Sequence, residues 1–172
     1  MRSQARCFDE LRAYAESVPL IDCHDHTLKP GPKYRDPIHV IVSGYFPSDL
    51  TSAGSDAAVA ALNDGSRSLE ERWGILEPIW RRTCHTGYAQ VTRRVLRRFY
   101  DEEALTFDAL KRMEGRLLNL EDRATFEGIL DEAKIETRIA DCWPDATKIL
   151  DGTLELAPRA RLAIGLPGYH RL

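Results

Sequence analysis

The eight residues from Leu20 to Thr27, LIDCHDHT, join a short apolar run to a pair of histidines, His24 and His26. The apolar residues after a proline predict a short strand that ends at the histidines. Residues two apart on a strand point to the same side, so the two imidazoles should face one space, about 6–7 Å apart along the strand. Imidazole is a good ligand for zinc, iron, nickel and manganese. The stretch therefore predicts a pair of metal ligands, with two loop-capping histidines as the alternative.

Asp22 shares that side of the strand and is expected to orient one of the histidines through a hydrogen bond. Upstream, residues 5–17 carry apolar residues at helical spacing and predict a helix that Pro19 stops. Downstream, residues 28–67 are rich in Pro, Gly, Ser and Asp and predict an irregular loop. Within this loop, Ile38–Phe46 is interpreted as a short strand or a segment that packs on the body of the protein.

Residues 68–120 are predicted to form a helical insert. Ser68 and Glu71 fit a capping box at the start of its first helix, and Pro78 should kink or end that helix. A second helix is predicted over residues 85–100, with Tyr88 on its apolar half. Thr106 is expected to begin a third helix, which carries Leu117 and Leu118 in its apolar pattern.

Residues 121–172 are expected to supply further βα units. Asp122 can cap a helix, KIETRIADCW predicts a second strand over residues 134–143, a short helix is expected at Asp145–Leu150, and RLAIGL predicts a third strand over 161–166. Strands separated by helices imply parallel pairing, so the fold class is α/β. We expect one partial domain over residues 1–172, divided into segments 1–27, 28–67, 68–120 and 121–172.

Composition excludes some classes of protein. The chain has 172 residues, 43% of them hydrophobic, and a net charge of −3, which argues against a nucleic-acid or membrane-surface binder. No apolar run approaches the roughly 20 residues of a membrane helix, and the N-terminus lacks an apolar signal core. The four cysteines, Cys7, Cys23, Cys84 and Cys142, show no C-x-x-C spacing and are interpreted as buried, reduced thiols of a cytoplasmic protein.

The stretch LIDCHDHT resembles the first-strand motif of the amidohydrolase superfamily of metal-dependent (β/α)8 barrels. The segment from Ser68 to Thr106, SLEERWGILEPIWRRTCHTGYAQVTRRVLRRFYDEEALT, is similar to the helical insert after the first strand in the amidohydrolase-related branch, which includes uronate-isomerase-like proteins. The resemblance implies the N-terminal part of a TIM barrel. It also implies a divalent metal, zinc with manganese or iron as alternatives, held by His24 and His26.

The resemblance further implies metal ligands on later strands and a general base, none of which is located in this chain and which we expect beyond Leu172. A (β/α)8 barrel takes about 250 residues, so we expect these 172 residues to be the N-terminal portion of a longer enzyme, inactive or weak by itself. A second copy of the chain in a homo-oligomer is the alternative source of the missing metal ligands and general base. The implied reaction on a small-molecule substrate is attack of metal-activated water on a C–N or ester-like bond.

Three alternatives to the hydrolase stay open. Decarboxylation or uronate isomerisation would fit the same superfamily, and a non-enzymatic α/β fragment that requires a partner chain is the competing class. A helical module that binds anions or nucleic acid is the third reading, and it would use six arginines. These are Arg81, Arg82, Arg93, Arg94, Arg97 and Arg98. We interpret them instead as a solvated helix face neutralised by nearby acids.

Other candidate residues have weaker support. His85 and Tyr88 are weak candidates for substrate binding, although the helical pattern places Tyr88 in the core. Asp141 ends the second strand and is a minor candidate for the same site, whereas Cys23 should point away from His24. His39 and His170 are interpreted as surface or loop residues.

Overall fold

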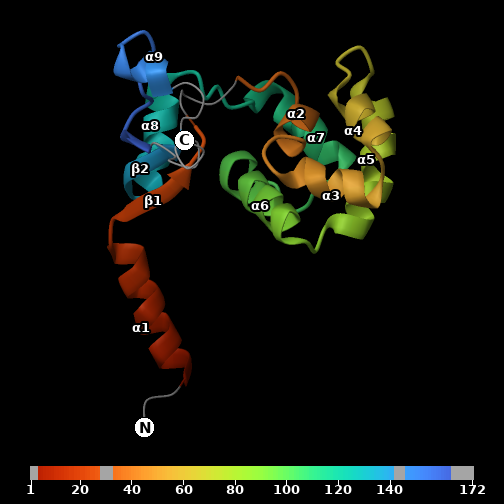
Figure 1. Ribbon diagram of the computed structural model, residues 1–172. Helices are drawn as coiled ribbons and strands as arrows, with labels where there is room; N and C mark the ends of the chain where they lie inside the picture. The colour runs from red at the N-terminus through yellow and green to blue at the C-terminus, as the bar shows by residue number, and fades with distance from the viewer. Residues whose placement is uncertain (1–3, 28–32, 142–145, 164–172) are drawn as a thin grey trace, which may run out of the picture. The chain divides into compact units, whose positions relative to one another are not determined.

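The computed structural model describes residues 4–27, 33–141 and 146–163, and it has a mixed α/β fold. The chain divides into two compact units. The sheet unit comprises residues 1–32 and 120–172, and the helical unit comprises Lys33–Asn119. The helical unit is therefore inserted into the sequence of the sheet unit, after its first strand (Figure 1).

The sheet unit contains three parallel strands in the order β1-β2-β3 within its described residues. They are β1 (Leu20–Asp25), β2 (Ile135–Asp141) and β3 (Ala160–Ala163), and each overlaps a segment predicted to be a strand. The described helices of this unit are α1 (Gln4–Ser17), α8 (Arg123–Glu132) and α9 (Ala146–Leu150). The predicted parallel α/β arrangement is confirmed, but the described sheet is open and forms no barrel.

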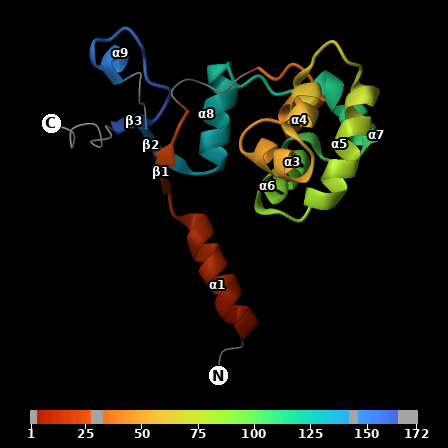
Figure 2. The ribbon, with the colours of Figure 1, turned by 45° about the vertical axis from the view of Figure 1, so that its right-hand side comes forward.

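Helix α8 connects the helical unit to β2 and lies beside the strands (Figure 2). As predicted, Asp122 caps it, with its carboxylate accepting a hydrogen bond from the Thr125 amide at 2.8 Å. Phe126 and Leu130, one turn apart, form a small apolar cluster with Ala157. The one-turn spacing places Phe126 and Leu130 on the same face of α8, next to Ala157, and leaves the polar residues of α8 on the other face.

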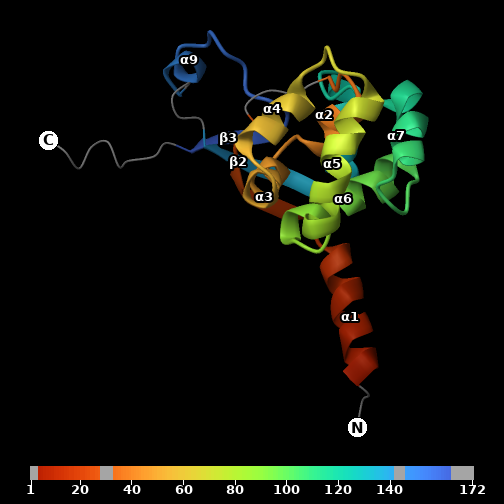
Figure 3. The same ribbon diagram turned by 90° about the vertical axis from the view of Figure 1, so that its right-hand side faces the viewer.

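Helix α1 forms where its periodicity predicts a helix, but its apolar side chains are exposed. Phe8, Leu11 and Tyr14 expose between 64% and 68% of their surface. The helix extends away from the strands in each view (Figures 1 to 3). At its C-terminal end, the Lys134 ammonium donates to the Glu16 carbonyl and ties the helix to the start of β2.

The helical unit is built almost entirely from helices (Figure 3). They are α2 (Pro37–Ile41), α3 (Phe46–Ala53), α4 (Asp56–Asn63), α5 (Leu69–Thr83), α6 (Gly87–Val95), a π-helical turn η1 (Leu96–Tyr100), α7 (Phe107–Met113) and a 3-10 turn η2 (Glu114–Arg116). The capping box of Ser68 with Glu71 and the Thr106 cap are confirmed. The third predicted helix ends before Leu117 and Leu118.

The prediction of an irregular loop over residues 28–67 was wrong for its described part. Asp36 accepts a hydrogen bond from the His39 amide, and Pro37 occupies the first turn of α2, a combination that starts helices. Ser55 caps α4 in the same way. The buried side chains of Ile38 and Ile41 then anchor α2 in the core, so the segment packs on the unit as a helix and not as a strand.

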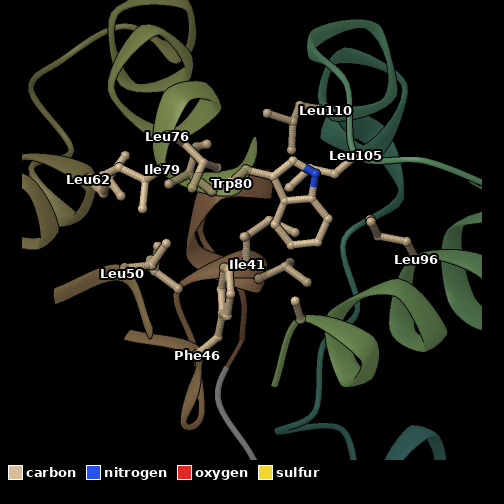
Figure 4. Close-up of a cluster of buried hydrophobic side chains, with 14 of the residues drawn as sticks. Ile41, Phe46, Leu50, Leu62, Leu76, Ile79, Trp80, Leu96, Leu105 and Leu110 are labelled. Atoms are coloured by element: carbon tan, nitrogen blue, oxygen red, sulfur yellow. The ribbon is translucent and has the colours of Figure 1, made fainter. Parts of the chain in front are cut away.

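One core holds the helical unit together (Figure 4). The Trp80 indole of α5 lies beside Ile41 of α2 and near Leu110 of α7, and it makes an edge contact with the Phe46 ring at 5.6 Å between ring centroids. Full burial of side chains of this size contributes about 1.5–3 kcal/mol each. This core also explains why α5 continues past Pro78, because the next turn buries Ile79 and Trp80 and offsets the missing backbone hydrogen bond.

One further expectation, that the cysteines are buried, needs correction. Cys7 and Cys23 are exposed and Cys84 is half-buried, all with free thiols, so the expectation of buried cysteines is wrong for the first two. Cys142 lies outside the described residues. In the part of the chain that the structure describes, none of the helices combines the length and the apolar character needed to cross a membrane.

Candidate functional site

His24 and His26 lie at the carboxyl end of β1 and present their rings to each other. The ring centroids are 4.5 Å apart and the ring planes are nearly perpendicular, at 88°. Both residues are exposed. Two imidazoles on one tetrahedral zinc ion, at Zn–N distances of about 2.0–2.1 Å, have centroids about 5 Å apart. The spacing of the two rings is therefore close to that of two imidazoles on one zinc ion.

The strand is irregular where it carries this pair. Pairing with β2 shifts between Asp22, opposite Arg138, and Asp25, opposite Ala140. The Asp22 carboxylate accepts a hydrogen bond from the backbone amide of His24 at 3.2 Å. Asp22 therefore contacts the backbone of His24 rather than its ring, and it supports the histidine at the point where the regular ladder is interrupted.

The residue between the two histidines is tied into the sheet. The Asp25 carboxylate pairs with the Arg138 guanidinium of β2, and it accepts a hydrogen bond from the Thr27 amide at 2.7 Å. The Asp25 side chain is 11% exposed and that of Arg138 is 3% exposed. Asp25 thus occupies a buried position, whereas its two histidine neighbours are exposed.

Arg138 was not identified from the sequence as part of the site. The available signal was a guanidinium in the middle of IETRIAD, a segment otherwise predicted to be a largely buried strand. A charged residue that is fully buried needs a partner. The sequence does not reveal which carboxylate provides it, because Asp25 and Arg138 are 113 residues apart in the chain.

The described residues contain no group of three or more His, Cys, Asp or Glu side chains placed to hold a metal ion. Asp141 lies at the carboxyl end of β2, on the same side of the sheet as the carboxyl end of β1. It does not complete such a group with the two histidines. The exposed Cys23 does not complete one either. Tight zinc sites use three or four ligands, so the donor set fits two positions of a metal site and is not a full site.

Tyr88 and His85 lie in the helical unit, and His85 is an exposed residue in the turn before α6. Tyr88 is 44% exposed and stacks on Tyr45, with ring centroids 5.7 Å apart. The expectation that Tyr88 is a core residue was therefore wrong. The two tyrosines line a largely apolar pocket of about 290 Å³ together with Tyr34, Phe46 and Val95, and His85 is not among its lining residues.

The arginines of α5, α6 and η1 have several different partners. Arg81 pairs with Glu77 at 2.7 Å, and Arg97 pairs with Glu103 at 2.9 Å. Arg82 donates to the Ala53 carbonyl at 2.6 Å, and the Arg93 guanidinium lies 5.8 Å from the Trp80 ring centroid. These contacts agree with a solvated helix face in which part of the charge is neutralised, and the prediction that nucleic acid is not a partner stays a prediction.

His39, expected to be a surface or loop residue, belongs to α2 and is half-buried. Burial lowers the pKa of the His39 imidazole, and the Arg35 charge lowers it further. The Arg35 amide donates to His39 Nδ1 at 3.3 Å, so Nδ1 is the ring nitrogen that carries no proton in this contact. His170 lies outside the described residues.

Comparison with known proteins adds no family to this geometry: no family model matches the chain, and neither a curated protein nor a solved structure matches it.

Proposed function

We propose that this chain supplies the first part of a metal-dependent hydrolase of the amidohydrolase type. The observation that supports the proposal best is the His24–His26 pair, whose rings lie 4.5 Å apart at the carboxyl end of a parallel strand. Active sites of parallel α/β folds gather at this edge of the sheet. The three parallel strands with α8 are compatible with the beginning of a (β/α)8 barrel, which is the proposed complete fold.

In this proposal, His24 and His26 hold a divalent metal, zinc or alternatively manganese or iron, with further ligands from groups outside the described set. The bound metal supplies a Lewis acid that activates water for attack on a C–N or ester-like bond of a small molecule. The chain's own contribution is to fix the two imidazoles. Asp22 supports the His24 backbone, and Asp25 is anchored in the sheet.

Metal content of the purified chain tests this proposal. Because two imidazoles alone hold zinc weakly, zinc is measured at equilibrium by dialysis against free zinc, where the native chain should take up about one equivalent. The double variant His24→Ala/His26→Ala should retain only background. The matched control is His85→Ala, which removes an exposed histidine from a turn of the helical unit and should keep the native content. Equal zinc content in the native chain and the double variant would contradict the proposal.

A further inference from the structure

We infer that Arg138 is a positioning residue that holds His26 beside His24, and this inference rests on the proposed metal site. Arg138 lies in the middle of β2, opposite Asp22 of β1. Its side chain is 3% exposed, in a sheet whose two histidines are exposed. The explanation for burying this charge lies in the four groups that it contacts.

The guanidinium ties together three separate parts of the sheet unit. Nη1 contacts the Asp25 carboxylate and donates to the Thr27 carbonyl at 3.2 Å. Nε and Nη2 both donate to the Pro158 carbonyl, at 3.3 and 3.0 Å. The guanidinium carbon lies 5.2 Å from the centre of the Phe126 ring. One side chain therefore connects the end of β1 to the segment before β3 and to α8.

His26 depends on this connection because regular pairing ends before it. Strand β1 ends at Asp25, and the ladder is already irregular between Asp22 and Asp25. The residues on either side of His26 are both held by Arg138, through the Asp25 carboxylate and the Thr27 carbonyl. The hydrogen bond from the Thr27 amide to Asp25 closes the same short segment. His26 is thereby fixed from both sides without a contact to its imidazole.

The charges of this arrangement are compatible with a metal cation nearby. A buried guanidinium alone would repel a cation, but the Asp25 carboxylate compensates its charge. The contacts also require arginine in particular. A lysine ammonium is a single point charge on a flexible stem and cannot reproduce a planar set of donors aimed at Asp25, Thr27 and Pro158.

The test compares four variants of the full chain. Arg138→Met removes all the hydrogen bonds and keeps much of the side-chain volume, and Arg138→Lys keeps the charge. Asp25→Asn weakens the contact of Arg138 with the residue between the histidines, and it also changes the acceptor of the Thr27 amide. Leu130→Ala is the control, because it damages the apolar cluster of α8 that includes Phe126 and leaves the guanidinium hydrogen bonds to Asp25, Thr27 and Pro158 in place. Two quantities are measured: Co²⁺ affinity from visible absorption, and backbone NMR order parameters along β1.

The inference predicts that Arg138→Met binds Co²⁺ about 10- to 100-fold more weakly, the usual loss when a residue that orients metal ligands is removed. Arg138→Lys should restore little of the affinity. The order parameters of His26 and Thr27 should fall from about 0.85 towards 0.6 or lower, while those at the centre of β2 stay high. Leu130→Ala should lower stability and change neither the affinity nor the His26 order parameter.

Three outcomes would overturn the inference, and they differ from failure of the proposed function. Native affinity in folded Arg138→Met overturns it, and so does an unchanged order parameter at His26. An equal loss of affinity in Leu130→Ala would reduce the role of Arg138 to general stability. If the native chain binds Co²⁺ no better than His24→Ala/His26→Ala, the metal site itself fails, and the order parameters still decide whether Arg138 fixes His26. If Arg138→Met does not fold, Arg138→Lys, which keeps the charge balance with Asp25, carries the same comparison.

Discussion

Single residues show how far local sequence can predict a site. The pairing of His24 with His26 follows from a two-residue spacing on a strand, and the short distance between their rings agrees with that expectation. The contact of Arg138 with Asp25 joins residues that are distant in the chain, so no local pattern indicates it. A buried charge in a strand predicts that a partner exists, but only the folded sheet shows that the partner is Asp25.

Glu102 gives a prediction on pH at the same scale. Its side chain is 8% exposed and accepts two hydrogen bonds of 2.7 Å from Arg112, which lower the pKa of the Glu102 carboxyl. A lowered pKa in the folded state means that the stabilisation is complete above the unfolded value, near 4.3, and is lost as the pH falls through the folded value.

We therefore expect Glu102→Gln to lower the free energy of unfolding at pH 7 and to have a smaller effect at pH 3. Urea denaturation across this pH range measures the difference. Glu103→Gln is the matched control, because Glu103 is 84% exposed in its pair with Arg97 and exposed pairs contribute little. A difference between the native chain and Glu102→Gln that does not change with pH would contradict the assignment.

At the scale of elements, the prediction was right where a capping side chain or a regular apolar period marked a helix or a strand. The caps by Ser68, Thr106 and Asp122 and the positions of the three strands were predicted from side-chain chemistry and periodicity. The helices α2 to α4 were missed because the many Pro, Gly and Ser residues suggested a loop, although Asp36-Pro37 was a helix start.

Tyr88 was misplaced for a geometrical reason. A regular wheel over residues 85–100 assumes one constant period, but η1 changes the period after Val95. The buried positions of α6 are Ala89 and Thr92, so Tyr88 lies off the buried face. A π-helical turn has no sequence signature that a wheel can detect, which explains the error.

Pro78 provides the prediction at this scale. It is exposed and lies inside α5, so replacing it leaves no cavity and restores a backbone donor. Proline costs about 3 kcal/mol in a helix interior, partly offset by about 0.4–1 kcal/mol from the more restricted unfolded chain. Because α5 already accommodates the ring, we expect Pro78→Ala to stabilise the helical unit by about 1–2 kcal/mol.

Denaturation followed by circular dichroism measures this change. Gly74→Ala is the control for a general gain in helix propensity, since Gly74 has open space around its Cα and lies in the same helix. It should give about 1 kcal/mol or less. A loss of stability in Pro78→Ala would contradict the expectation that the proline costs stability within α5.

At the scale of the whole molecule, each compact unit has its own apolar cluster. The helical unit has the large core around Trp80, whereas the described sheet unit has small clusters around Phe126 and Ala140. The sequence indicated one partial domain, because apolar periodicity does not tell which elements share a core.

The isolated segment Lys33–Asn119 is therefore expected to fold by itself, with a cooperative thermal transition and the helical circular dichroism of α2 to α7. Within this segment, Leu76→Ala should lower stability by about 2–5 kcal/mol, because Leu76 is fully buried in the core. Val91→Ala is the control, since Val91 is 58% exposed. A segment without a cooperative transition would show that the helical unit depends on the rest of the chain.

The isolated bridge between Lys33 and Asn119 has a consequence for how the sheet assembles. This antiparallel bridge brings together the two ends of the helical unit. Strand β1 must find β2 across the whole inserted segment, since Leu20 pairs with Ile135. The entropy lost in closing such a long loop slows folding. If the helical unit folds first, its joined ends leave only a short effective loop to close between β1 and β2. The pairing of β1 with β2 would then nucleate faster than it would across an unfolded insertion of the same length.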